Sequence, residues 1–238
     1  MLVAAAVCPC PPLLVPEVAV GAAPEMDAAR AACTDALGVL AAARPDLLIV
    51  VGPAGSGEGG VFPRGARGTF KGYGVDLDVR LGDGAHDAAT ARRLPSSLAV
   101  GAWLLERTGW ADAPVEGLGA EETLTPERCA ETGRELGGRA DRVALLVLGD
   151  GSACRTVKAP GYLDERAAPY DAAAARALAA ADLPALLSLD AGLARTLKSS
   201  GRAPWQILAG AAEGADLDGS LLYEDAPYGV GYLVASWS

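Results

Sequence analysis

The sequence predicts a single α/β domain with a mixed, mostly parallel central sheet flanked by helices. Three continuous apolar segments, at residues 2–7, 46–51 and 142–148, are typical of strands that are buried on both faces. Ala-rich segments of helical length separate them, which indicates βαβ units with right-handed crossovers. No internal repeat or linker divides the 238 residues, a length that suits one large domain.

The N-terminal third begins with a strand over residues 2–7 that ends in the turn CPCPP. Apolar residues at helical spacing predict a helix over residues 24–43, followed by a strand over residues 46–51. The Gly-rich residues 52–72 are expected to form a mobile loop. Residues 75–81 alternate as VDLDVRL, the period of a half-exposed strand.

The middle of the chain continues this alternation. A helical region is expected over residues 87–108, interrupted at Pro95, and a short strand over residues 115–118. Thr125 and Pro126 are a good helix start, with Thr125 as the N-cap and Pro126 in the first position.

The C-terminal third follows the apolar strand at residues 142–148. Helices are expected around residues 171–182, 184–199 and 203–212. Residues 217–223 and 229–236 are expected to form a hairpin or two strands.

Composition restricts the partners and the compartment. The formal net charge is −10 and no basic stripe with interleaved aromatic residues occurs, so nucleic acid is not an expected partner. No apolar run approaches the length that spans a bilayer, so no membrane partner is expected either. The N-terminus lacks the basic region of a signal peptide. We therefore expect a soluble cytoplasmic protein.

Histidine and cysteine are scarce. His86 is the single histidine, so a site that needs two or three imidazoles cannot be built within one chain. His86 itself is expected in a loop or on the surface. The five cysteines, an odd and sparse set, argue against a disulfide framework: Cys8, Cys10, Cys33, Cys129 and Cys154.

The loops after the three apolar strands read CPCPP, GPAGSG and GDGSAC. Ligands of open α/β sheets bind beyond the carboxyl ends of the strands. We therefore expect Cys10, Ala54 and the segment from Ser152 through Ala153 to Cys154 to surround one pocket.

Polar residues are densest around the third of these loops. Asp150, Ser152, Cys154, Arg155 and Lys158 form either an ordinary turn or a small-ligand site in which Arg155 or Lys158 meets an anionic group.

Tyr228, beside Pro227 at a turn near the C-terminus, is placed to reach the same pocket, whereas Tyr232 is expected to pack within its strand.

The CPCPP turn admits three interpretations. In the first, Cys8 lies in the core and Cys10, on the opposite side of the extended chain, is an inert wall of the pocket. In the second, the two thiols bind a soft metal, Cu(I) or Zn²⁺, with Cys154 as a third ligand. In the third, one cysteine is a reactive thiol with a depressed pKa.

The segments CPCPPLLVPEV, GPAGS, GDGSAC and YGVGYLVAS, in this order and at these strand ends, resemble the B subunits of class III extradiol dioxygenases. This LigB-like superfamily includes the Memo proteins, and the resemblance covers nearly the whole chain. It implies a LigB-like α/β fold. In active members two His and one Glu hold a non-haem Fe(II), and a further His acts as acid or base.

The resemblance places these groups on particular residues. The first ligand would fall on Cys10, the second in the Gly52–Ala54 turn, and the acid–base His near Ala153. No carboxylate occurs over residues 200–205, where the Glu would be expected. The chain thus resembles a divergent member that lacks the usual His ligands.

Three functions follow as expectations. The first is a catalytically degenerate protein, a pseudoenzyme, whose pocket binds a small molecule or a partner without iron chemistry. The second is a thiol-based copper or zinc protein of Memo type, with Cys10 and Cys154 as ligands. The third is a ring-cleaving oxidoreductase with a rearranged iron site. The resemblance also implies association of copies into a homo-oligomer.

Overall fold

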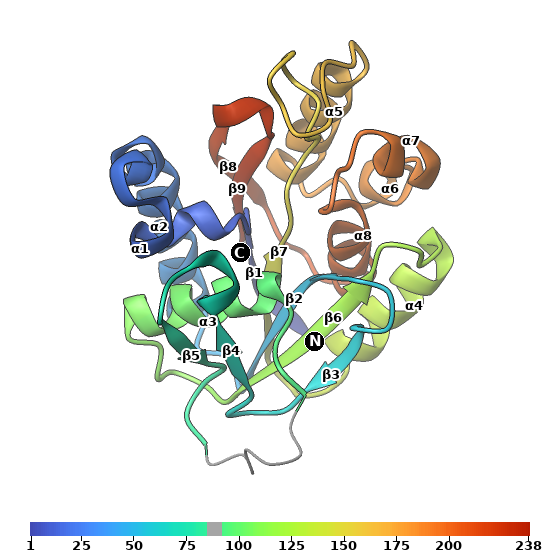
Figure 1. Ribbon diagram of the computed structural model, residues 1–238. Coiled ribbons are helices and arrows are strands. Elements are labelled where there is room, and N and C mark those ends of the chain that lie inside the picture. The colour runs from blue at the N-terminus through green and yellow to red at the C-terminus, as the bar shows by residue number, and fades with distance from the viewer. Residues whose placement is uncertain (85–91) are drawn as a thin grey trace.

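A mixed β-sheet forms the centre of the computed structural model (Figure 1). Among the described residues, 1–84 and 92–238, the sheet has the strand order β3-β6-β2-β7-β1-β9-β8. Its strands are β1 (Leu2–Cys8), β2 (Leu47–Ala54), β3 (Gly60–Phe62), β6 (Val115–Glu121), β7 (Val143–Leu148), β8 (Gly219–Asp225) and β9 (Tyr232–Trp237). The four central strands β6, β2, β7 and β1 are parallel, and the outer pairings are antiparallel. The predicted α/β fold with a centrally parallel sheet is therefore confirmed.

Helices cover both faces of the sheet (Figure 1). They are α1 (Pro16–Ala19), α2 (Asp27–Ala42), α3 (Ser96–Thr108), α4 (Pro126–Gly137), α5 (Ala167–Ala179), α6 (Leu183–Leu187), α7 (Ala191–Thr196) and α8 (Arg202–Ala211). Short 3₁₀ turns lie at Pro12–Leu14, Val20–Met26, Lys71–Tyr73 and Pro227–Gly229. In the part of the chain that the structure describes, no helix is both long and apolar enough to cross a membrane.

Strand alternation divides the core into two clusters. Alternate residues of the central strands, such as Cys8 on β1 and Leu146 on β7, pack with α2 and α3 in what we call the α2–α3 cluster. The residues between them, such as Val7 and Val147, pack with α4, α5 and α8 in the α5–α8 cluster. The two clusters therefore lie on opposite faces of one sheet.

Several element boundaries differ from the sequence prediction. The helix predicted from residue 24 begins at Asp27, because a 3₁₀ segment precedes it. The strand predicted over residues 75–81 is limited to β5 (Asp78–Arg80). Residues 184–199 form two short helices, α6 and α7, because Asp182 and Asp190 each cap a new helix through the side chain.

The Gly-rich segment at residues 52–72 is not a single irregular loop. Strand β2 continues to Ala54, and β3 then pairs with β6. A second hairpin joins β4 (Arg67–Thr69) to β5.

The helix predicted over residues 87–108 is described only from residue 92 onward. It begins at Ser96, after Pro95, and His86 lies outside the described residues. The predicted N-cap at Thr125 is confirmed, since its hydroxyl accepts a hydrogen bond from the backbone N–H of Arg128 at 3.3 Å.

Helices α4 and α8 cross in direct backbone contact. Gly210 of α8 faces α4, and a Cβ atom at this position would clash with the backbone of Ala130. Arg202, at the start of α8, is buried beside the crossing, and its guanidinium donates to the carbonyls of Glu122 and Leu124. The crossing fixes the position of α8, and Ser200 and Gly201, directly before α8, bond to the loop that follows β7.

We expect Gly210→Ala to lower the free energy of unfolding by about 2–4 kcal/mol, because the backbones must separate to admit the methyl group. Gly38→Ala in α2 is the matched control, since nothing lies within 4 Å of the Cβ that would be added. It should be neutral or stabilising by up to about 1 kcal/mol through helix propensity. Urea unfolding checks both, and equal stability of the two variants would contradict the close crossing.

Candidate functional site

The two central strands β1 and β7 leave the sheet in opposite directions. The chain leaves β1 toward α2, on the face of the α2–α3 cluster, whereas it leaves β7 toward α5, on the other face. The strands are neighbours, so a crevice opens between the two departing connections. The residues that follow β1 and β7 therefore lie where ligands of open α/β sheets bind.

The register places three candidate residues at one level of this edge. Cys8 pairs with Leu148 across β1 and β7, and Val51 pairs with Val147 across β2 and β7. Counting on along each strand brings Cys10 level with Asp150, and Ala54 level with Asp150 on the other side. The register thus brings Cys10 and Ala54 level with Asp150, whereas the sequence prediction groups them with Ser152, Ala153 and Cys154, which lie further along the loop.

Asp150 is held in place on both its main chain and its side chain. Its Oδ1 accepts a hydrogen bond from the backbone N–H of Cys10 at 2.8 Å. Its own N–H donates to Ser200 Oγ at 3.0 Å, and its carbonyl accepts from Gly201 N–H at 2.9 Å. Gly149 is required beside it, because a Cβ there would overlap the backbone of Gly201. The loop before α8 thus fixes the carboxyl group against the end of β1.

Burial dominates the electrostatics of this carboxyl group. Loss of solvent raises the pKa of Asp150 from its ordinary 3.8 to about 7, and the hydrogen bond from Cys10 N–H opposes the rise only in part. Burial, followed by the charge of Asp150, also raises the pKa of the Cys10 thiol. Burial likewise raises the pKa of Tyr232, again with a contribution from Asp150. Asp150 is therefore the group at this edge that changes charge near neutral pH.

A second buried aspartate organises the rest of the loop. Asp171 of α5 is 1% exposed and accepts from Ser152 N–H at 2.7 Å and from Ser152 Oγ at 2.8 Å. Its other partner is the guanidinium of Arg155, at 3.0 Å. Backbone bonds then join the loop to the chain before β9, from Gly151 N–H to Gly231 O at 2.7 Å and from Gly231 N–H to Ser152 O at 2.8 Å. We call these contacts of Asp171 with Ser152 and Arg155 the clamp. Ser152 is fully buried, so it belongs to the clamp rather than contacting a ligand.

Arg155 and Lys158, the two residues predicted to meet an anionic group, differ in whether the protein already pairs them. Arg155 is paired with Asp171, which neutralises it within the protein. Lys158 is exposed on the same loop.

Tyr228 lies at the rim, with φ of 59°, and its hydroxyl donates to Glu25 Oε2 at 2.8 Å. Its side chain is 43% exposed, and its reach into the pocket stays a prediction.

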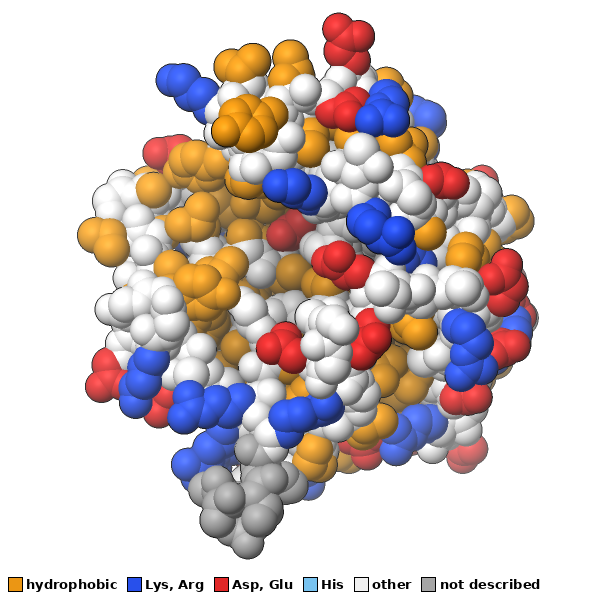
Figure 2. Space-filling view, turned by 45° about the vertical axis from the view of Figure 1, so that its right-hand side comes forward, with side chains coloured by type: hydrophobic (Ala, Val, Ile, Leu, Met, Phe, Trp, Pro, Cys, Tyr) orange, Lys and Arg blue, Asp and Glu red, His pale blue; other side chains and the backbone are white. Residues whose placement is uncertain are grey.

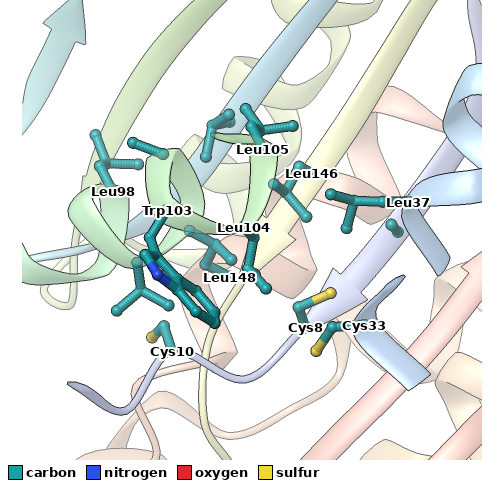
Figure 3. Close-up of a cluster of buried hydrophobic side chains, with 14 of the residues drawn as sticks. Cys8, Cys10, Cys33, Leu37, Leu98, Trp103, Leu104, Leu105, Leu146 and Leu148 are labelled. Carbon is teal, nitrogen blue, oxygen red and sulfur yellow. The ribbon is translucent and has the colours of Figure 1, made fainter. Parts of the chain in front are cut away.

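The cysteines do not divide as the sequence suggested. Cys8 and Cys10 both belong to the α2–α3 cluster, so the expectation of opposite faces is wrong. Residues two apart on an extended chain share a face. Figure 3 shows Cys10 on the side of Trp103 and Cys8 on the side of Cys33. A hydrogen bond with Cys33, together with burial, raises the pKa of Cys8.

Cys154 lies on the other side of the sheet. It belongs to the α5–α8 cluster, and its thiol donates to the carbonyl of Leu197 at 3.4 Å. Burial raises its pKa. Cys10 and Cys154 therefore do not converge as two ligands of one metal ion.

Fe(II) does not fit the groups at this edge. The positions implied by the family resemblance carry the protonated thiol of Cys10 and the methyl groups of Ala54 and Ala153. Across residues 1–84 and 92–238, no group of three or more His, Cys, Asp or Glu side chains could hold a metal ion. Asp150 alone supplies one carboxylate, whereas a facial triad needs three ligands.

The surface at this side of the molecule is hollowed at its middle (Figure 2). An acidic side chain lies inside the hollow, hydrophobic side chains line one flank, and Lys and Arg side chains lie above it. Asp150 keeps part of its surface exposed, whereas Cys10 and Tyr232 are buried.

Two participants were not predicted from the sequence. Ser200 holds the main chain of Asp150, and Asp171 holds the loop through Ser152. The sequence contains one indication of the role of Asp171, since an acidic residue stands among the buried alanines of α5. Ser200 has none, since only the fold brings it to the end of β7.

Comparison with known proteins identifies the fold alone. No family model and no curated protein matches the chain. Among solved structures, the chain is similar to the crystal structure of an uncharacterized protein, JW3007, from Escherichia coli K12. The TM-score is 0.56 and the identity 15%, and the match covers 99% of each chain. At this identity the likeness supports the α/β architecture and nothing about the site.

We expect Asp150→Asn to change how stability depends on pH. A carboxyl group whose pKa is raised by folding retains its proton in the folded chain after the unfolded chain has lost it. Its contribution to stability is therefore present below pH 3.8 and is lost as pH rises to about 7. Relative to the wild type, the variant should gain roughly 2–4 kcal/mol across this range. Urea unfolding at several pH values tests this, and parallel curves for the two proteins would contradict it.

We expect Asp171→Asn to lower the free energy of unfolding by about 2–4 kcal/mol, because Arg155 loses its counter-charge and one buried acceptor is replaced by an amide donor. Asp164→Asn is the control, since Asp164 pairs with Arg166 at the exposed surface, where ion pairs contribute little. Chemical denaturation of both variants gives the comparison. Equal stability of Asp171→Asn and the wild type would rule out the clamp.

Proposed function

We propose that this chain is a divergent relative of the class III extradiol dioxygenases that binds a small organic molecule in the crevice beside Asp150, without iron chemistry. The observation that carries the proposal is the donor set at the strand ends. A thiol and two methyl groups occupy the positions where the resemblance implies the two His ligands and the acid–base His. An iron site would need ligands that these residues do not provide.

The crevice itself supports binding. It lies at the switch point of the sheet, where neighbouring parallel strands connect to opposite faces. One partly exposed carboxyl group stands among buried side chains of mostly apolar character, including Trp103 and Cys10. A few convergent polar groups in an apolar surround are typical of small-molecule sites.

The arrangement of the loops supports a preformed site. The clamp at Asp171 and the hydrogen bonds of Asp150 hold the loop after β7 by partners on four other segments: the turn after β1, α5, the loop before α8 and the chain before β9. A preformed site avoids the entropic cost of ordering loops on binding.

Anaerobic loading with Fe(II), followed by oxygen and a panel of catechols, tests the absence of iron chemistry. We expect no ring-opened product by absorbance and no stoichiometric iron after desalting. Free Fe(II) and a heat-unfolded sample are the blanks. Ring-cleavage product above these blanks would overturn the proposal and favour the rearranged iron site.

Elemental analysis after exposure to Cu(I) or Zn²⁺ tests the thiol alternative, with Cys10→Ser beside the wild type. We expect equal and substoichiometric metal in both. Stoichiometric metal that is lost in Cys10→Ser would favour the metal-binding function instead.

A further inference from the structure

Two buried or partly buried aspartates lie at the same end of the sheet, but only one has a counter-charge. Asp171 is paired with the guanidinium of Arg155 and accepts two further hydrogen bonds. Asp150 accepts one hydrogen bond, from Cys10 N–H, and no ion pair involves it among residues 1–84 and 92–238. The carboxyl group of Asp150 is therefore left without a cation in a setting that removes much of its water.

A carboxylate in such a setting needs a partner. Withdrawing an ionised carboxylate from water costs several kcal/mol unless a cation or several donors replace the solvent. The described chain supplies one donor to Oδ1, so the remaining acceptor positions of Asp150 are free. Asp150 is also partly exposed, so a ligand in the crevice has access to it.

The protein's own cations on this loop are placed elsewhere, since Arg155 is paired with Asp171 and Lys158 is exposed. The charge of Asp150 contributes to the raised pKa values of two groups, Cys10 in the turn after β1 and Tyr232 on β9. Both have raised pKa values, so both are neutral at pH 7 and neither competes for the carboxylate. The elements that contribute Ser200 and Trp103 place a hydroxyl and an aromatic ring in the same region, without charge.

The whole molecule favours a positive partner. The net charge of −10 gives a negative field that attracts cations and repels anions over distances of about a Debye length.

We propose that Asp150 recognises a protonated amine and that the ligands of this crevice are small ammonium compounds with an apolar or aromatic body. The ammonium nitrogen donates to the free oxygen of Asp150, and the apolar body lies against apolar side chains of the α2–α3 cluster at this edge. This inference rests on the proposed small-molecule function and names the class of ligand.

Three probes of matched shape test the ligand class: benzylamine, benzyl alcohol and benzoate, at pH about 8, where Asp150 is ionised and the amine is still largely protonated. Ligand-observed NMR and chemical-shift titration of the intact protein measure the affinities. We expect benzylamine to bind more tightly than benzyl alcohol by about tenfold, and benzoate to bind least.

Asp150→Asn keeps an acceptor for Cys10 N–H but removes the charge, and should weaken benzylamine binding by about tenfold while leaving benzyl alcohol within about twofold. Asp112→Asn, an exposed aspartate between α3 and β6, is the control for net charge and should leave both affinities unchanged. In the wild type, benzylamine affinity should rise from about pH 5 to about pH 8 as Asp150 ionises, and Asp150→Asn should flatten this rise. The pH series on the wild type keeps the test valid even if the variant does not fold.

Each outcome decides the matter. Equal binding of benzylamine to the wild type and to Asp150→Asn, a flat pH series, or no binding of benzylamine overturns the inference. Binding of benzyl alcohol or benzoate in place of the amine, with shifts at residues beside Asp150, overturns the amine class but leaves the small-molecule function standing. Ring cleavage in the iron assay has the opposite effect, since it removes the proposed function while an amine contact to Asp150 can persist.

Discussion

A single buried carboxylate, that of Asp171, ties the loop after β7 to helix α5 and, through Ser152 and Gly231, to the chain that enters β9. Its charge is balanced by Arg155, so the contact is stable although almost no water reaches it. The position of Asp150 depends on this clamp, because Asp150 lies on the same loop only two residues before Ser152. The geometry of the crevice thus follows from an ion pair that takes no direct part in binding.

The two aspartates differ in what replaces the water that each carboxyl group loses on folding. Asp171 meets its own cation within the fold and becomes structural. Asp150 meets a backbone N–H and neutral side chains, and folding leaves it as a carboxyl group that changes charge near pH 7. Unbalanced buried charge is destabilising, so its presence at a switch point of the sheet is an indication of function rather than of stability.

The uncharged side chains beside Asp150 at the strand ends bear on this distribution. A thiol and two methyl groups at the strand ends leave the edge of the sheet with little positive charge and few metal donors. Arg155, on the same loop, is paired with Asp171, and no ion pair offsets Asp150 among the described residues.

The sequence by itself determined the α/β class and the buried central strands. Apolar runs and parallel connections depend on local composition and on the regular spacing of strands, and both are visible in one dimension. It also located the helix start at Thr125, because capping is a local interaction.

Only the tertiary structure decided which polar groups pair. Asp171 is 16 residues from Arg155, and Ser200 is 50 residues from Asp150, yet each pair is in hydrogen-bond contact. Likewise, the sequence grouped Cys154 with Cys10, whereas the fold placed them in clusters on opposite faces. The charge state of a carboxyl group depends on burial and on partners brought together from distant segments, and no local pattern encodes either.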